Sequence, residues 1–291
     1  MLRAGGRAPI FAYGDALADE TAARLQLLQY ADNILLAALE DGTTRLSSGE
    51  WKGVFPPTIT HALEAAAAQA YVHRAISAFP LQHFDKPVPL PCAYRLPLGT
   101  VESFVDAVAA LTLLELGLYG DVLRGTRETW VLPAVAGALG AKARTSGLLD
   151  LMRNHTVGAG VGEVPLPSGL GYAYLQRYVG FCPGEDEASG GLAERFDARP
   201  RRLRVSGRET TPDGGRVTRV AVEFVGEAMF VARVGGFGVV EVTAVEGGAA
   251  AVPVDMYGHV WAVVTKEKDV KWEDLEGAAV AGPELVWLGQ P

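Results

Sequence analysis

The chain has little cysteine, no excess of positive charge and no long apolar run, and each shortage excludes a class of protein. Its two cysteines, Cys92 and Cys182, cannot build a structural zinc site by themselves. The formal net charge of -8 argues against nucleic acid as a partner. No apolar run reaches the roughly 18 residues that a membrane span needs. The first 20 residues lack the apolar core of a secretory signal, so we expect an intracellular protein, or a secreted one whose leader has been removed.

The remaining composition is that of an ordinary globular protein. The 291 residues are 49% hydrophobic and 21% charged, which supplies ample core material and suggests two domains. Histidine is scarce and scattered, and we interpret most of these side chains as surface or structural groups rather than catalysts. The five are His61, His73, His83, His155 and His259.

Apolar residues recur at helical spacing in four segments of the first half. The predicted helices are 16–40, 57–79, 100–123 and 128–153. We expect the Asp41-Gly42 pair to end the first of them, and Thr100 to begin the third. Five prolines between residues 80 and 99 predict a long non-helical connection, and a short helical piece is expected near 173–179.

After Arg199 the pattern changes to the alternation that is typical of strands. The predicted strands lie in RLRVSG, RVTRVAVEFV, AMFVARV, FGVVEVTAV and HVWAVVTK. Helices followed by strands predict an α+β protein. A long crossover in the middle of four helices is how ferritin-like bundles are connected. We therefore expect a four-helix bundle over residues 1–199 and an Ig-like β-sandwich over residues 200–291.

Several stretches support a family assignment for nearly the whole chain. PVPLPCAYRLPLGTVESFVDAVAALTLLELGLYG (87–120), GALGAKARTSGLL (137–149) and YVGFCPGED (178–186) occur in this order, followed by GHVWAVVT and VAGPELV. Together they resemble the fungal ferritin-like family of desiccation-related or stress-response proteins. The resemblance implies a ferritin-like bundle whose fourth helix is normally built around Glu-Ala-Arg-His.

The resemblance also implies that the metal ligands of that family have been lost. A ferritin-like di-metal centre takes carboxylates from each helix and Glu-x-x-His pairs from two of them. The family's ligand positions fall on Gln29, Asp32, Gln69, Val72, Thr112, Lys142 and Thr145. Of these only Asp32 could still bind a metal, and Lys142 would repel one. A shift of one residue would bring in His73, and a shift of one turn would bring in Glu115, but the set would still be too poor for two metals.

Lys142 therefore stands where the family keeps a metal ligand. A carboxylate left in a core without its metal is costly unless a cation pairs with it, so we expect Lys142 to pair with Asp32 or Glu115. The alternative is a solvated Lys142 on the outer face of the bundle. If the amine of Lys142 is buried, we expect its pKa to be about 7, well below the ordinary value.

The resemblance places Cys92 and Cys182 at two family positions that bracket the third and fourth helices. In an oxidising compartment we expect them to form a disulfide, and in the cytosol we expect two free thiols.

A bundle that has lost its metals keeps a core with polar remnants, which could bind an apolar metabolite. The residues expected to line it are Gln29, Tyr30, Gln69, His73, Thr112, Glu115, Tyr119 and Thr145, with Tyr71 nearby. We expect no cofactor, and the preferred hypothesis is a cofactor-independent cyclase or isomerase of fungal secondary metabolism. In it, Lys142 polarises a substrate carbonyl and Asp32 orients Lys142.

Two alternatives stay open. One is a non-catalytic, secreted or surface stress protein, and the other is a di-iron oxidase. Association of the chain into homo-oligomers is also left open.

Overall fold

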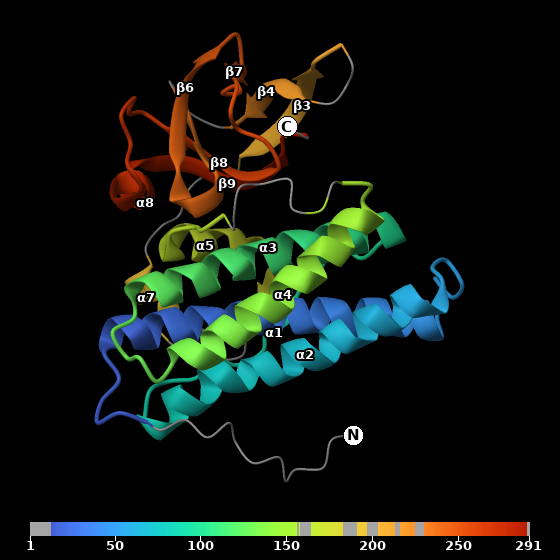
Figure 1. Cartoon of the computed structure of the whole chain (residues 1–291), viewed down its shortest axis with the longest axis vertical. Helices are drawn as coiled ribbons and strands as arrows, with labels where there is room; N and C mark the ends of the chain where they lie inside the picture. Colours follow the sequence, from blue (N-terminus) through green and yellow to red (C-terminus); the bar gives the residue numbers. More distant parts are fainter. Residues whose placement is uncertain are drawn as a thin grey trace. The chain divides into compact units, whose positions relative to one another are not determined.

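A computed structural model describes residues 13–155, 157, 164–182, 191–196, 203–212, 216–224 and 230–289. The protein is a mixed α+β structure, in which long helices precede an antiparallel sheet (Figure 1). It divides into two compact units. The helical unit comprises Met1–Glu115, Tyr119–Thr145 and Tyr178–Arg195, and the sheet unit comprises Leu116–Leu118, Ser146–Arg177 and Phe196–Pro291. The domain boundary predicted at residues 199–200 lies outside the described residues.

The four segments predicted as helices are helical, with somewhat different ends. They are α1 (Asp19–Ser47), α2 (Pro57–His83), α3 (Val101–Gly125) and α4 (Leu132–Met152). Thr100 caps α3 as expected: its hydroxyl accepts from the backbone N–H of Ser103, whose own hydroxyl accepts from the backbone N–H of Thr100. None of the described helices is both long enough and apolar enough to cross a membrane.

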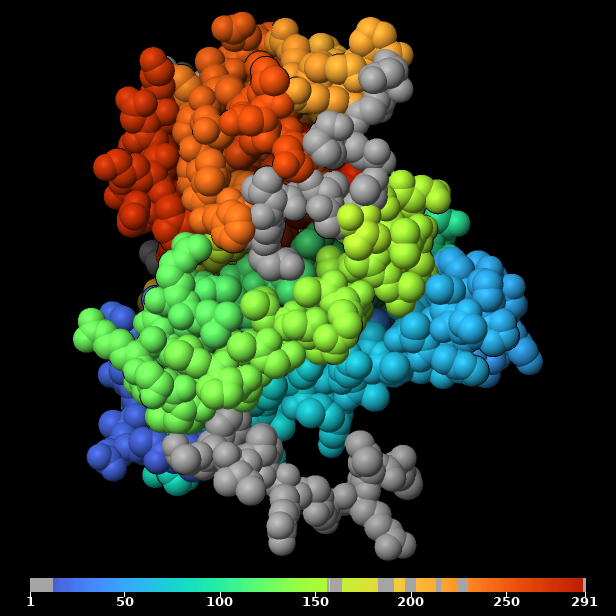
Figure 2. All heavy atoms as spheres, viewed as in Figure 1, coloured from blue at the N-terminus to red at the C-terminus, as the bar shows by residue number. Residues whose placement is uncertain are grey.

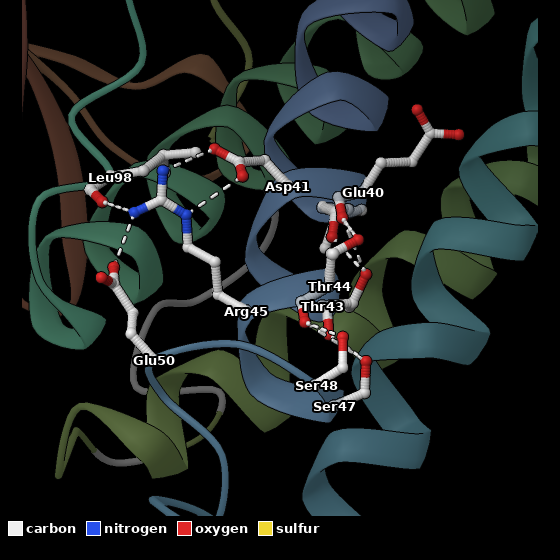
Figure 3. Close-up of polar contacts among 10 residues, drawn as sticks. Glu40, Asp41, Thr43, Thr44, Arg45, Ser47, Ser48, Glu50 and Leu98 are labelled. Carbon is white, nitrogen blue, oxygen red and sulfur yellow. Dashed lines mark hydrogen bonds and ion pairs between the residues drawn. The ribbon is translucent and has the colours of Figure 1, made fainter.

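The predicted end of α1 at Asp41-Gly42 is wrong, because side chains of the last turns hold the helix together (Figure 3). Arg45 binds both carboxylate oxygens of Asp41 one turn earlier, at 3.0 and 3.2 Å. The same guanidinium also donates to Glu50 Oε1 at 2.8 Å and to the carbonyl of Leu98 at 3.0 Å. Arg45 thus links the end of α1 to Glu50, just after the helix, and to Leu98, just before α3.

Gly42 serves packing rather than termination. A Cβ atom at this position would lie 2.1 Å from the ring of Phe104, which is fully buried on α3. The glycine therefore lets α1 and α3 approach closely, at a cost in helix propensity that the packing offsets.

The connection between α2 and α3 is fixed by a disulfide. Cys92 and Cys182 are bonded, and their neighbours form a small antiparallel ladder between β1 (Ala93–Tyr94) and β2 (Val179–Phe181). The short helix α7 (Leu192–Arg195) follows in the same unit and contacts α1. Of the two alternatives left open by the sequence, a disulfide or two free thiols, the structure has the disulfide.

The sheet unit contains α5 (Ser168–Leu175), slightly before its predicted place, and α8 (Leu275–Ala278). Its strands are β3 (Arg204–Thr210), β4 (Val217–Glu223), β5 (Phe230–Val234), β6 (Val240–Glu246), β7 (Ala249–Ala251), β8 (His259–Thr265) and β9 (Ala279–Trp287). They form one antiparallel sheet in the order β3-β4-β7-β6-β5-β8-β9.

The sheet curls until its first and last strands meet. β3 contacts β9, and Arg216, which directly precedes β4, forms an isolated bridge with Gly289, which follows β9. One face of the curl packs into an apolar core that includes Val220, Val231 and Val260. The five predicted strands all correspond to strands of this sheet.

The sequence patterns missed β9, because a Gly282-Pro283 pair interrupts its alternation. Gly282 has φ +104°, and a Cβ there would lie 2.8 Å from the carbonyl oxygen of Ala262 on β8. The pairing of β8 with β9 shifts register between Ala262 and Val264, so the glycine lies at an irregularity in the ladder.

Candidate functional site

Lys142 is buried within the helical unit, as predicted, and is paired with both candidate acids. Its Nζ donates to Asp32 Oδ1 at 2.9 Å and makes a close contact with Glu115 Oε2. Asp32 comes from α1, Glu115 from α3 and Lys142 from α4, and their exposed fractions are 0%, 0% and 3%. We call these three side chains the Lys142 triad. The alternative of a solvated lysine is wrong.

The pKa expected for Lys142 is also wrong, although the burial is right. Desolvation lowers the pKa of the ammonium group, but the attraction of Asp32 and Glu115 outweighs it and raises the pKa above its ordinary value. Burial raises the pKa of Glu115 well above its ordinary value, and the nearby Lys142 offsets this only in part. A raised pKa favours the neutral form of the Glu115 carboxyl, so one ammonium group can balance the charge of the two buried acids.

Three further polar side chains face the triad. The phenol of Tyr119 donates to Asp32 Oδ2 at 3.4 Å, and Lys142 Nζ lies 5.5 Å from the centre of its ring. Burial, followed by repulsion from Lys142, lowers the pKa of His73 on α2 to about 4. His73 Nδ1 and Thr112 Oγ1 are buried without a hydrogen-bond partner among the described residues.

The cavity beside the triad is very small. It measures about 10 Å³ and is lined by Leu35, Leu39, Ala66, Gln69, Ala70, His73, Thr112, Lys142 and Thr145, which come from α1, α2, α3 and α4. Figure 2 shows side chains of α2 (cyan) and α4 (light green) meeting on one face of the helical unit. A cavity of this size holds about one water molecule, whereas metabolite sites measure about 300–1,000 Å³. In this conformation the triad has no room for a metabolite.

The structure places some of the predicted lining residues at the cavity or the triad and the others elsewhere. Gln69, His73, Thr112 and Thr145 line the cavity, and Glu115 and Tyr119 contact the triad. Gln29 is buried but accepts a hydrogen bond from Ser77 at 2.8 Å, and Tyr30 is buried outside the lining. Tyr71 is 60% exposed and Val72 is 52% exposed, so neither faces the core. On α2 the inward residue is His73, one position after the residue that the family pattern indicates.

The sheet unit contains a larger pocket that the sequence patterns did not predict. It measures about 380 Å³ and lies at one end of the curled sheet, between the β5–β6 turn and the segment that leads into β8. Its lining residues are Gly235, Gly236, Val239, Glu241, Asp255, Met256, Tyr257 and Val260. These residues come from two segments that lie side by side because β5 pairs with both β6 and β8, and no local spacing predicts that pairing.

Comparisons with known proteins add no identification: no family model matches the chain, and no curated protein is significantly similar to it.

Proposed function

We propose that this protein binds a small apolar amine in the pocket of the sheet unit, and that its helical unit is a metal-free, ferritin-like four-helix bundle. The observation that carries the proposal is the 380 Å³ pocket, which falls in the size range of small-molecule sites. The mouth of a closed or curled sheet is one of the usual places for such sites.

Apolar side chains surround the pocket at the protein surface. Phe237, Val239 and Val254 are 74%, 52% and 82% exposed. Val239 lines the pocket, Phe237 follows the lining residue Gly236, and Val254 precedes the lining residue Asp255. Phe237 also has φ +59°, a conformation that few non-glycine residues adopt. An apolar rim next to a pocket is typical of a ligand site rather than of bare surface.

The charge of the lining specifies the ligand further. Glu241 and Asp255 form no ion pair with any described residue, so the lining carries two carboxylates. The cation opposite Glu241 on the neighbouring strand is Arg233, and its guanidinium is directed elsewhere. It donates to Thr243 Oγ1 at 2.6 Å and to the carbonyl oxygen of Ala250 at 3.2 Å. An apolar ring carrying an ammonium group complements this lining, and an apolar acid does not.

The experiment compares 1-naphthylmethylamine with 1-naphthoate, which share a ring but differ in charge, by isothermal titration calorimetry on the full chain. We expect saturable binding of the amine and at least about 10-fold weaker binding of the acid. Val239→Trp should fill the pocket and abolish binding of the amine. Val72→Trp is the matched control, since Val72 is equally exposed but lies on α2. Equal binding of amine and acid, or full binding by Val239→Trp, would overturn the proposal.

The ferritin-like interpretation of the helical unit rests on the sequence resemblance, and the Lys142 triad supports it. A ferritin-like ancestor would have held metal ions where the ammonium group now contacts Asp32 and Glu115. The non-catalytic stress protein is thus our preferred alternative for this unit, and the Ig-like sandwich stays our interpretation of the sheet unit. A di-iron oxidase would instead carry two iron or manganese ions per chain after purification, which elemental analysis detects.

A second candidate is the cofactor-independent cyclase or isomerase at Lys142. The buried atoms without partners, His73 Nδ1 and Thr112 Oγ1, favour it because they could bind a substrate carbonyl. It requires the helices around the cavity to separate. Backbone hydrogen exchange of α2 and α4 tests this: exchange that occurs only through global unfolding would contradict a binding-competent open state.

A further inference from the structure

The sheet unit contains a cluster of potential metal ligands, made of Asp150, His155 and His259. His259 Nε2 lies 2.9 Å from Asp150 Oδ1, and His155 Nδ1 lies 3.9 Å from the same oxygen. One ligand atom from each of the three residues can be chosen so that all lie within 4.8 Å of one another. The cluster shares no residue with the lining of the 380 Å³ pocket.

The end of α4 places two of the three residues together. Asn154 has φ +57°, and its N–H donates to the carbonyl of Leu151 at 3.1 Å. The N–H of His155 donates to the carbonyl of Asp150 at 2.8 Å. These two bonds form a Schellman motif with Asn154 in the left-handed position. The motif turns the chain back, so that the imidazole of His155 lies near the carboxylate of Asp150.

The sheet supplies the third residue. His259 begins β8 and pairs with Trp287 of β9, whose ring lies 4.7 Å from that of His259. Trp287 also stacks on His155, with ring centres 4.1 Å apart and the planes 2° from parallel. One indole therefore packs against both imidazoles and restrains their orientations.

We propose that Asp150, His155 and His259 bind one divalent transition-metal ion, with Zn²⁺ as the best-suited ion. Two imidazoles and one carboxylate are a usual ligand set for such ions, and three protein ligands leave a position open for water or a substrate. Ligands about 2.1 Å from one ion lie about 3–3.5 Å apart. The observed 2.9 and 3.9 Å, and the limit of 4.8 Å within the cluster, therefore require shifts of up to about 1.5 Å, which side-chain rotation can supply.

Burial and access are also suitable for a metal. The side chains of Asp150 and His259 are 9% and 6% exposed, whereas that of His155 is 17% exposed and leaves a route from solvent. The second ring nitrogen of His259, Nδ1, has no hydrogen-bond partner among the described residues. The Asp150 carboxylate favours a proton on Nε2 when no metal is bound. No described group opposes a proton on Nδ1, so the proton can move there when a metal takes its place at Nε2.

The test titrates Zn²⁺ into the full chain after treatment with EDTA, using calorimetry and the thermal midpoint. We expect one ion per chain and a raised midpoint. Cu²⁺ should in addition quench the fluorescence of Trp287, because the indole stacks on a ligand. Trp287→Phe should lose that quenching while it keeps Zn²⁺ binding.

His259→Ala and Asp150→Asn should each weaken Zn²⁺ binding by more than about 100-fold. His61→Ala, which removes an exposed histidine of α2, should leave it unchanged. Circular dichroism without metal establishes that each variant is folded. No saturable binding by the native chain, or unchanged binding by both folded cluster variants, would refute the site. The titration uses no organic ligand, so its outcome is independent of the amine pocket.

Discussion

Replacing Lys142 by methionine keeps the side-chain length and removes the cation of the triad. Two carboxyl groups with exposed fractions of 0% then lose their counter-charge. Removing one partner of a buried ion pair costs about 3–5 kcal/mol, so we expect the free energy of unfolding at pH 7 to fall by that amount. For a chain of this size, that loss lowers the thermal midpoint by about 6–20 °C.

The loss should depend on pH in a defined direction. Burial raises the folded-state pKa of Glu115 well above the unfolded value of about 4, and removing Lys142 takes away the charge that opposes this rise. A raised folded-state pKa gives stability that is present below the unfolded pKa and is lost as the pH rises through the folded one. The deficit of Lys142→Met relative to the native chain should therefore be small near pH 4 and grow towards pH 7.

The assay is urea unfolding followed by circular dichroism, at several pH values. Adding Asp32→Asn to Lys142→Met removes one charge of each sign and should restore most of the lost stability. Lys86→Met is the control: it breaks the exposed Lys86–Asp19 pair at 2.8 Å and should barely move the midpoint. A loss below about 1 kcal/mol, or a double variant as unstable as the single one, would refute this account of the triad.

Three further predictions concern stability. Denatured protein prepared without reductant should show no reactive thiol, and two reactive thiols would contradict the disulfide. Cys92→Ser should lower the free energy of unfolding by about 4 kcal/mol, because the bond joins residues 90 apart in sequence. Gly42→Ala should destabilise the protein by about 1–3 kcal/mol, because the new Cβ would collide with the ring of Phe104. Gly140→Ala, whose Cβ would meet no atom within 4 Å, should stabilise it by up to about 1 kcal/mol. Equal effects of the two changes in chemical unfolding would exclude this packing argument. The pKa of His73 is about 4 in the folded protein and about 6.5 in the unfolded chain, so acid favours the unfolded chain. The free energy of unfolding should therefore fall by about 2 kcal/mol between pH 7 and pH 5 because of this one side chain. His73→Gln should lose that part of the pH dependence, and an imidazole that titrates near 6.5 by NMR would contradict it.

The helices and most strands could be predicted from the sequence, because their signals are local. Thr100 marked the start of α3, and alternation marked β8. Predictions from neighbouring residues failed where a contact with a residue distant in sequence determines where a helix ends. Asp41-Gly42 resembles a helix end, but Arg45 and the ring of Phe104 make the glycine an interior residue of α1.

The ion pair of the Lys142 triad was also predictable, because one physical requirement constrained it. The family resemblance placed Lys142 and Asp32 at ligand positions of one core, and a shift of one turn brought in Glu115. A buried amine there needs an acid, and the structure pairs it with both. The raised pKa of Lys142 was not predictable, because it depends on both acids contacting one ammonium group.

The remaining features were decided by the tertiary structure alone. His155 and His259 are 104 positions apart in sequence, and only the fold of the sheet unit brings both to Asp150. The 380 Å³ pocket likewise depends on the pairing of β5 with β6 and β8, which brings its lining segments together. The sequence by itself determined which segments are helix or strand and which charges need a partner, since these follow from neighbours a few residues away. Which distant side chains share a site depends on long-range packing, which no local pattern encodes.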